Sequence, residues 1–97
     1  VRLAFSVTDY VVRLVRATRD SPDLVCGASP RAGVLLASAA RARAALDGRD
    51  YVVPDDVKGL AVSVLRHRLL LSPAAEIEGK QVEALVAQLV EQTEAPR

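Results

Sequence analysis

Residues 54–68 read PDDVKGLAVSVLRHR, and this stretch carries the strongest fold signal in the chain. Proline suits the first position of a helix, where its missing N–H costs nothing, and the two aspartates after it complement the positive end of the helix dipole. Apolar residues recur at helical spacing along one face, at Val57, Leu60, Ala61, Val64 and Leu65. This face would extend to Arg68 and leave Lys58, Arg66 and His67 on the other side. The pattern predicts an amphipathic helix that begins at Pro54.

A preceding helix is predicted from Ser29-Pro30, a good N-cap residue followed by a proline in the first helical position. It should run through Arg31 to about Asp47 and end at Gly48. Small side chains on its inward face would permit close approach of a neighbouring helix. The expected inward face consists of Leu35, Ala39, Ala42 and Leu46.

A third helix is predicted near the N-terminus. It should follow Ser6 or Thr8 as N-cap residue and end by Ser21-Pro22, because the residue before a proline is pushed out of the α region. Its apolar face would consist of Val7, Val11, Leu14 and Val15.

The C-terminal part should contain a short extended segment and one more helix. Residues 69–72 would leave the preceding helix in an extended or short-strand form, with Pro73 as the stop. The last helix should run from about Gly79 or Lys80 to Gln92, with an apolar face of Val82, Leu85, Val86, Leu89 and Val90. The sequence therefore predicts an all-α fold, a small four-helix bundle, with short extended segments at the N-terminus and around residues 69–72.

The composition is that of one small domain and argues against several classes of protein. The 97 residues carry 13 Lys+Arg and 12 Asp+Glu, so no global field attracts nucleic acid or anionic lipid. No apolar run approaches the ~20 residues that a membrane span needs. One Cys and one His predict no metal site and fit a reducing, cytoplasmic setting. Because the chain has no Met, we expect residues 1–97 to be one domain of a longer protein.

Arg31 carries a positive charge at a helix position where such a charge is unfavourable. A cation in the first turn of a helix opposes the helix dipole, so an anion is expected to compensate it. The first-turn N–H groups already favour a phosphate or a carboxylate, and an arginine fork adds donors that match such oxygens. The alternatives are that Arg31 pairs with a nearby carboxylate, Asp20 or Asp23, or that it lies in solvent.

Four motifs occur in a fixed order: Ala17-Thr18-Arg19, then Gly27-Ala28-Ser29-Pro30-Arg31-Ala32, then residues 48–57 (GRDYVVPDDV) and residues 64–69 (VLRHRL). Together they resemble the C-terminal lid domain of the MoxR family of AAA+ ATPases. The resemblance covers roughly residues 8–72, and the last predicted helix is only loosely like the family. The family usually has Thr where this chain has Val53, so a hydroxyl that would cap the helix beginning at Pro54 is absent.

The resemblance implies that an upstream α/β module holds the Walker motifs, ATP and Mg²⁺, and that this lid closes over the nucleotide. Arg31 would be the catalytic sensor-2 arginine that reaches the β- and γ-phosphates. Ala28, Ser29 and Pro30 would complete the nucleotide-binding set by fixing the helix start that aims it, with Ser29 capping the backbone. The 97 residues contain no P-loop, so they should not hydrolyse ATP alone.

Three further residues lie in family-like motifs, and each has a plainer structural interpretation. Arg19, Arg66 and His67 would contact the core module or a neighbouring subunit. Arg66 and His67 could instead complement the negative end of the helix dipole, and Arg19 could be a solvated or ion-paired side chain.

By the same resemblance, the whole protein would be a homo-hexameric ring that acts as a chaperone. It would remodel or mature partner proteins, some of them with von Willebrand factor A domains. The alternative is a non-enzymatic helical module that binds DNA or a protein through a helix-turn-helix or histone-like arrangement. A DNA-binding function is disfavoured because the chain has no one-sided Arg/Lys face.

Overall fold

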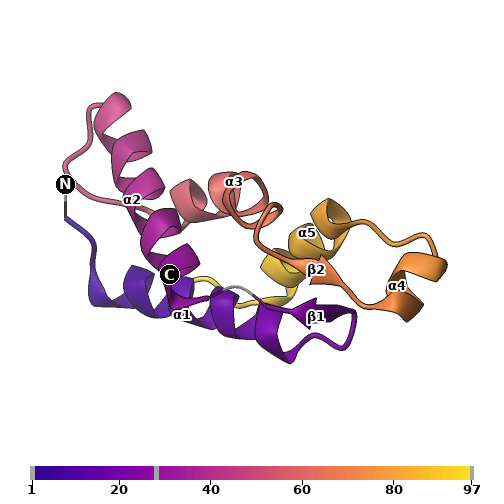
Figure 1. Cartoon of the computed structure of the whole chain (residues 1–97). Coiled ribbons are helices and arrows are strands. Elements are labelled where there is room, and N and C mark those ends of the chain that lie inside the picture. The colour runs from indigo at the N-terminus through magenta and orange to yellow at the C-terminus, as the bar shows by residue number, and fades with distance from the viewer. Residues whose placement is uncertain (1, 28, 97) are drawn as a thin grey trace.

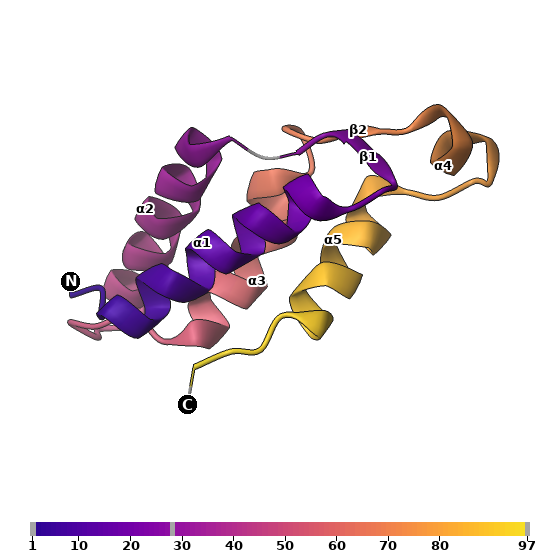
Figure 2. The same cartoon turned by 90° about the horizontal axis from the view of Figure 1, so that it is seen from below.

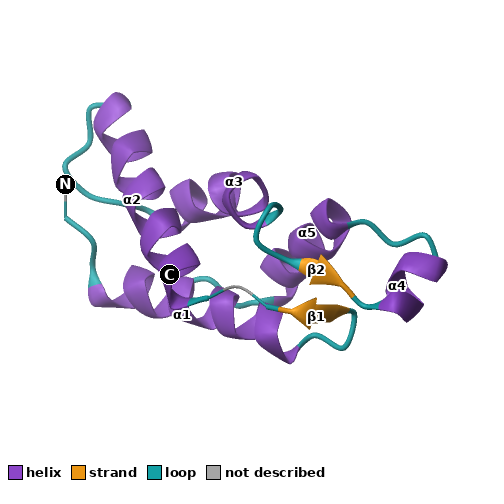
Figure 3. Cartoon of the chain, viewed as in Figure 1, coloured by secondary structure: helices purple, strands orange, loops and turns teal. Residues whose placement is uncertain are grey.

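The computed structural model describes residues 2–27 and 29–96, apart from the side chain of Cys26. Within these residues the chain forms five helices and two short strands (Figures 1 and 3). These are α1 (Phe5–Asp20), β1 (Leu24–Cys26), α2 (Pro30–Leu46), α3 (Pro54–Leu65), β2 (Leu70–Leu71), α4 (Pro73–Ile77) and α5 (Val82–Gln92). The predicted all-α fold is confirmed, and α4 and β1 are elements that the sequence did not lead us to expect.

Helices α1 and α3 lie together in the middle of the bundle, with α2 packed on one side and α5 on the other (Figure 2). The largest fully buried side chains come from all four helices: Tyr10, Leu14, Thr18, Leu36, Val57, Leu65 and Val86. The strands and α4 form an extension at the end away from α2, and the chain measures 44 × 21 × 20 Å. The core therefore joins the four longer helices, whereas the extension contributes little to it.

The predicted buried face of α1 is confirmed, and Tyr10 and Thr18 also belong to it. The predicted start of α1 is wrong, because the N-cap residue is Ala4 rather than Ser6 or Thr8. Thr8 lies inside the first turn, and its hydroxyl donates to the Ala4 carbonyl at 3.3 Å. A helix can start without a side-chain cap when the chain before it is held by other contacts.

Such contacts hold the segment that precedes α1. The Arg2 N–H donates to the carbonyl of Asp50 at 2.6 Å, and the Arg2 carbonyl accepts from the N–H of Val52 at 3.0 Å. These two bonds make a parallel β-bridge between Arg2 and Tyr51. The extended N-terminal segment predicted from the sequence is therefore present, and it is tied to the loop between α2 and α3.

The predicted buried face of α2 is wrong. The buried residues are Ala32, Leu36, Ala40 and Ala44, a stripe displaced by about one residue from the predicted one. Leu35 is 38% exposed and Leu46 is 88% exposed. Because Ala, Val and Leu occur almost all the way around this helix, the spacing of apolar residues does not single out one face. Packing against α1 and α3 decides which face is buried.

The second half of the chain differs from the prediction at Pro73. This residue was expected only to end the preceding segment, but it begins α4, with Ser72 as N-cap. The Ser72 hydroxyl accepts a hydrogen bond from the Ala75 N–H at 3.1 Å. Ser72-Pro73 is thus the same start signal as Ser29-Pro30. Gly79 then turns the chain with φ +79°, and α5 begins at Val82, slightly later than expected.

Helix α3 begins at Pro54 as predicted and ends at Leu65. Its buried residues include Val57, Ala61 and Leu65, as expected, whereas Arg68 lies beyond the helix and is exposed. The predicted extension of the buried face to Arg68 is therefore wrong, because the helical spacing stops three residues earlier. Residues 70–71 form β2 and pair antiparallel with β1, which confirms the predicted short extended segment.

Candidate functional site

The start of α2 carries the residues that the sequence singles out. Ser29 is the N-cap and Pro30 is the first helical residue, so Arg31 occupies the second helical position. All three residues are exposed. The Ser29 side chain makes no capping hydrogen bond in the described structure, which contradicts the expectation that it caps the backbone. The fourth predicted residue, Ala28, lies outside the described residues.

Arg31 extends from the helix start without a counter-charge. The first turn of α2 contains no acidic residue. Asp23, one of the two carboxylates considered as a partner, accepts instead from the Lys80 ammonium at 3.0 Å. Within residues 2–27 and 29–96, no ion pair or hydrogen bond joins the Arg31 side chain to Asp20 or to any other residue. The Ala32 N–H already donates to the Ser29 carbonyl at 3.0 Å, so the exposed Arg31 guanidinium is the group at this helix start that can bind a phosphate or a carboxylate from outside the domain.

The structure brings Arg19 to the same end of the bundle as Arg31. Arg19 lies in the last turn of α1, and its backbone lies against Gly27, the last described residue before Ser29. Arg19 and Pro30 also line one groove. Arg66 and His67 follow α3, and the Arg66 Nε donates to His67 Nε2 at 3.0 Å. No hydrogen bond or ion pair in the described structure connects either of these two residues to Arg31.

The groove between α1 and α2 has a volume of about 350 Å³. Its walls are mainly apolar, with Arg16 and Arg19 as the charged side chains, and the complete set is Leu3, Thr8, Val11, Val12, Val15, Arg16, Arg19, Pro30, Gly33, Val34 and Ala37. Val34 is 65% exposed and Val12 is 49% exposed. An apolar surface of this kind next to Arg31 is suited to contact with another domain.

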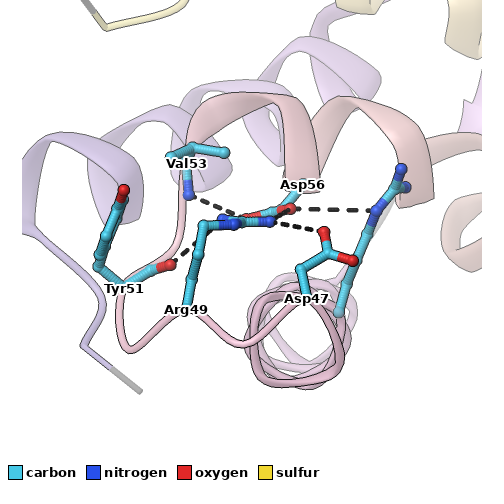
Figure 4. A network of polar contacts seen from close by, with 6 residues as sticks. Asp47, Arg49, Tyr51, Val53 and Asp56 are labelled. Atoms are coloured by element: carbon cyan, nitrogen blue, oxygen red, sulfur yellow. Dashed lines mark hydrogen bonds and ion pairs between the residues drawn. The ribbon is translucent and has the colours of Figure 1, made fainter.

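A second polar cluster lies at the other end of α2, and sequence reasoning missed it (Figure 4). The Arg49 guanidinium donates to both carboxylate oxygens of Asp56, each at 2.8 Å, and to Asp47 at 2.9 Å. Asp56 also accepts from the Val53 N–H at 2.9 Å, and its side chain is only 3% exposed. We call Asp47, Arg49, Val53 and Asp56 the Arg49 corner.

The charges at the Arg49 corner stabilise one another. The hydrogen bonds from Arg49 hold the pKa of the Asp56 carboxyl below its ordinary value. The same bonds raise the pKa of Arg49. The sequence led us to expect only that Asp56 complements the helix dipole. The sequence did contain a signal for one of these contacts. Asp56 is the third residue of its helix, and in a capping box an acidic side chain at this position accepts a hydrogen bond from the N–H of the N-cap residue.

The Arg49 corner connects α2 to α3 rather than forming an open site. Gly48 adopts φ +77°, a conformation that favours glycine, and so turns the chain directly after α2. Arg49 then reaches over the turn to Asp56 in the first helical turn of α3. Because this bidentate pair satisfies both carboxylate oxygens, the corner has a structural role.

No group of three or more His, Cys, Asp or Glu in residues 2–27 and 29–96 could hold a metal ion. None of the helices in these ranges combines the length and apolar character of a membrane-spanning helix.

Comparison with known proteins identifies the domain type. Residues 16–89 match the AAA lid domain family. The chain is 43% identical over 96 residues to the uncharacterised protein YeaC of Bacillus subtilis, covering 99% of this chain and 30% of YeaC. It is 38% identical over 101 residues to Chaperone MoxR1 of Mycobacterium tuberculosis, covering 95% of this chain and 27% of MoxR1.

The fold is also similar to a solved structure, that of a candidate ATPase from Cytophaga hutchinsonii. The TM-score is 0.92 with 30% sequence identity, over 100% of this chain and 32% of that chain. The chain thus spans about a third of the length of the proteins it matches. The resemblance to the lid of MoxR-family ATPases is confirmed, and the chain belongs to the AAA lid domain family.

Proposed function

We propose that this chain is the lid of a MoxR-like ATPase, in which it closes over ATP and Mg²⁺ held by a preceding α/β module. Arg31 is the sensor-2 arginine of this proposal. The observation that carries it is that Arg31 stands exposed at the second position of α2, with no acidic residue in the first turn and no charged partner within the described structure. The positive end of the α2 helix dipole favours the same anion.

The donor set fits a nucleotide phosphate. A phosphoryl group in transfer spreads negative charge over its oxygens, and positioned cations stabilise that charge. The guanidinium of Arg31 supplies a planar fork of donors from a rigid helix start, where Pro30 fixes the first backbone angle. Serine at position 29 has a hydroxyl that is not used for capping in the described structure, so it is available to the same ligand.

The lid would couple hydrolysis to movement. Arg31 contacts the γ-phosphate only while that group is bound to the rest of the nucleotide, so hydrolysis removes a contact that favours the closed position. The apolar groove between α1 and α2 supports a docking role for the same face, because Pro30 belongs both to the groove and to the helix start. We therefore propose that this face meets the ATP-binding module, with Arg19 at the joint and Arg66 and His67 toward the module or a neighbouring subunit.

The whole protein would then work as a homo-hexameric chaperone that remodels or matures client proteins. MoxR1, to which the chain is 38% identical, is named a chaperone, which supports this role. Clients with von Willebrand factor A domains and the hexameric ring follow from the family resemblance and belong to the same proposal. The similarity to MoxR proteins favours this function over the DNA- or protein-binding module considered above.

The deciding experiment is the ATP turnover of the full-length ATPase that contains this chain, with Arg31 intact and as Arg31→Ala. We expect turnover to fall by about 10²-fold, the scale observed when one preorganised donor to a developing charge is removed. Arg41→Ala is the matched control, because Arg41 is another exposed arginine of α2 with no charged partner in the described structure. Circular dichroism confirms folding of each variant, and unchanged turnover in a folded, assembled Arg31→Ala protein would overturn the assignment.

A further inference from the structure

Gly27 lies so close to the end of α1 that no side chain fits there. A Cβ atom built on Gly27 would lie 2.6 Å from the Cα of Arg19 and 2.8 Å from its backbone nitrogen. Real Cβ atoms do not approach other atoms this closely, and the obstacle is backbone that cannot rotate away. The φ angle of Gly27 is outside the left-handed region, so the glycine is required for space rather than for conformation.

The segment that contains Gly27 is also held on its other side. Strand β1 pairs with β2 through Leu24 with Leu71 and Cys26 with Leu70. The N–H of Ser72 donates to the Asp23 carbonyl at 2.7 Å. The Asp23 carboxylate pairs with Lys80 at 3.0 Å. The segment is therefore enclosed between the end of α1 and the β2 side, and an added side chain would have to displace it.

Such a displacement would reach the start of α2. Only residues 28 and 29 separate Gly27 from Pro30, the first residue of that helix. The direction of the first turn determines where the Arg31 guanidinium points, since Arg31 is the second helical residue. A shift of ~1 Å in a positioned group can change a rate by ~10²-fold.

We propose that Gly27 is a positioning residue for Arg31: its close packing on the Arg19 backbone sets the helix start that aims the guanidinium at the nucleotide phosphates. This inference rests on the proposed role of Arg31. Gly27 acts through that residue and needs no contact of its own with the nucleotide.

The test is a double-mutant cycle on ATP turnover of the full-length ATPase, with Gly27→Ala, Arg31→Ala and the combined variant. We expect Gly27→Ala to lower turnover by roughly tenfold when Arg31 is present and to cause no further loss in the Arg31→Ala background. The control is Gly59→Ala in α3, where the added Cβ meets only the end of the flexible Arg43 side chain. This control should keep full turnover.

The outcomes separate this inference from the proposed function. If Arg31→Ala alone leaves turnover unchanged, the proposed function fails at Arg31 and the inference fails with it. If Arg31→Ala lowers turnover but Gly27→Ala has no effect, or has the same effect in both backgrounds, only the inference is overturned. Should Gly27→Ala not fold, Asp23→Asn provides a second test, because it removes the ion pair to Lys80 without adding volume. Its loss of turnover, expected to be a few-fold, must also vanish in the Arg31→Ala background.

Discussion

The two ends of α2 each present an arginine, and their surroundings are opposite. Arg49, just after the helix, donates to Asp56 and Asp47 and lies over the ring of Tyr51 at 6.0 Å. Arg31, at the start of the helix, has no charged partner among the described residues. The charges therefore stabilise the fold at one end of α2, whereas the charge at the other end is the one that the proposed function assigns to the nucleotide. Removing Arg49 contacts should therefore affect stability, and removing Arg31 should affect turnover.

The largest expected effect on stability comes from Asp56→Ala. This change leaves the Arg49 guanidinium without its bidentate partner and the Val53 N–H without an acceptor. Because the Asp56 side chain is buried, losing its hydrogen bonds to a charged partner and leaving the Val53 N–H unsatisfied should lower the free energy of unfolding by about 2–3 kcal/mol. Thermal unfolding of the 97-residue chain should show a decrease in Tm of more than about 10 °C. A loss below about 1 kcal/mol would contradict the assignment of the Arg49 corner as the main polar contact between α2 and α3.

Acid should weaken the same corner. Because Arg49 holds the pKa of Asp56 below its unfolded value, the stabilisation is complete above the unfolded pKa, near ~4. It is lost as the pH falls through the lower folded pKa. The stability difference between the natural chain and Asp56→Asn should therefore be constant near neutral pH and shrink below about pH 4. Urea unfolding across this pH range measures it, and a constant difference down to the lowest pH would argue against the pair.

Val53→Thr should strengthen the corner. Valine at the N-cap of α3 makes no side-chain cap, whereas a threonine hydroxyl of nearly the same shape can accept from a first-turn N–H. We expect a gain of about 0.5–1 kcal/mol and a rise in Tm of a few degrees. The opposite sign, a loss of stability, would show that the Val53 methyl groups pack more tightly than its partial exposure suggests.

The smallest effect is expected for Arg31→Ala in the isolated 97-residue chain. A cation in the first turn opposes the helix dipole, so its removal should raise stability by about 0.3 kcal/mol or leave it unchanged. Chemical denaturation measures the change, with Arg41→Ala as the comparison. A loss above about 1 kcal/mol would mean that Arg31 has a structural partner, and the contrast between the two arginines would no longer hold.

The helix starts that could be predicted from the sequence are those marked by a proline in the first helical position. Ser29-Pro30 and Pro54 begin helices as expected, because a proline at the first helical position loses no hydrogen bond and has a backbone angle that suits the helix. Ser72-Pro73 carries the same signal and begins α4, although only its role as a stop was considered. The start of α1 at Ala4 depends on the pairing of Arg2 with the loop before α3, and such a contact between distant segments leaves no trace in local sequence.

The buried face of α2 and the partner of Asp56 could not be predicted, for related reasons. Leu35 and Leu36 are equally apolar, and only the shape of α1 and α3 decides that Leu36 is buried. Asp56 has several arginines nearby in sequence, and the turn at Gly48 brings Arg49 into two hydrogen bonds with it, whereas Arg43 approaches it only to 3.9 Å. For the candidate site, the absence of an acidic residue from the first turn of α2 is visible in the sequence and present in the structure, whereas the role of Arg31 stays a prediction.

The β-bridge at Arg2 has a mechanical consequence. Force applied to the chain ahead of Arg2 first loads the two backbone hydrogen bonds to Asp50 and Val52, rather than the first turn of α1. Those bonds end in the loop where Arg49 donates to the Tyr51 carbonyl and to the Asp56 carboxylate. A pull at the N-terminal end would therefore reach the junction between α2 and α3 through these bonds before it reached the first turn of α1.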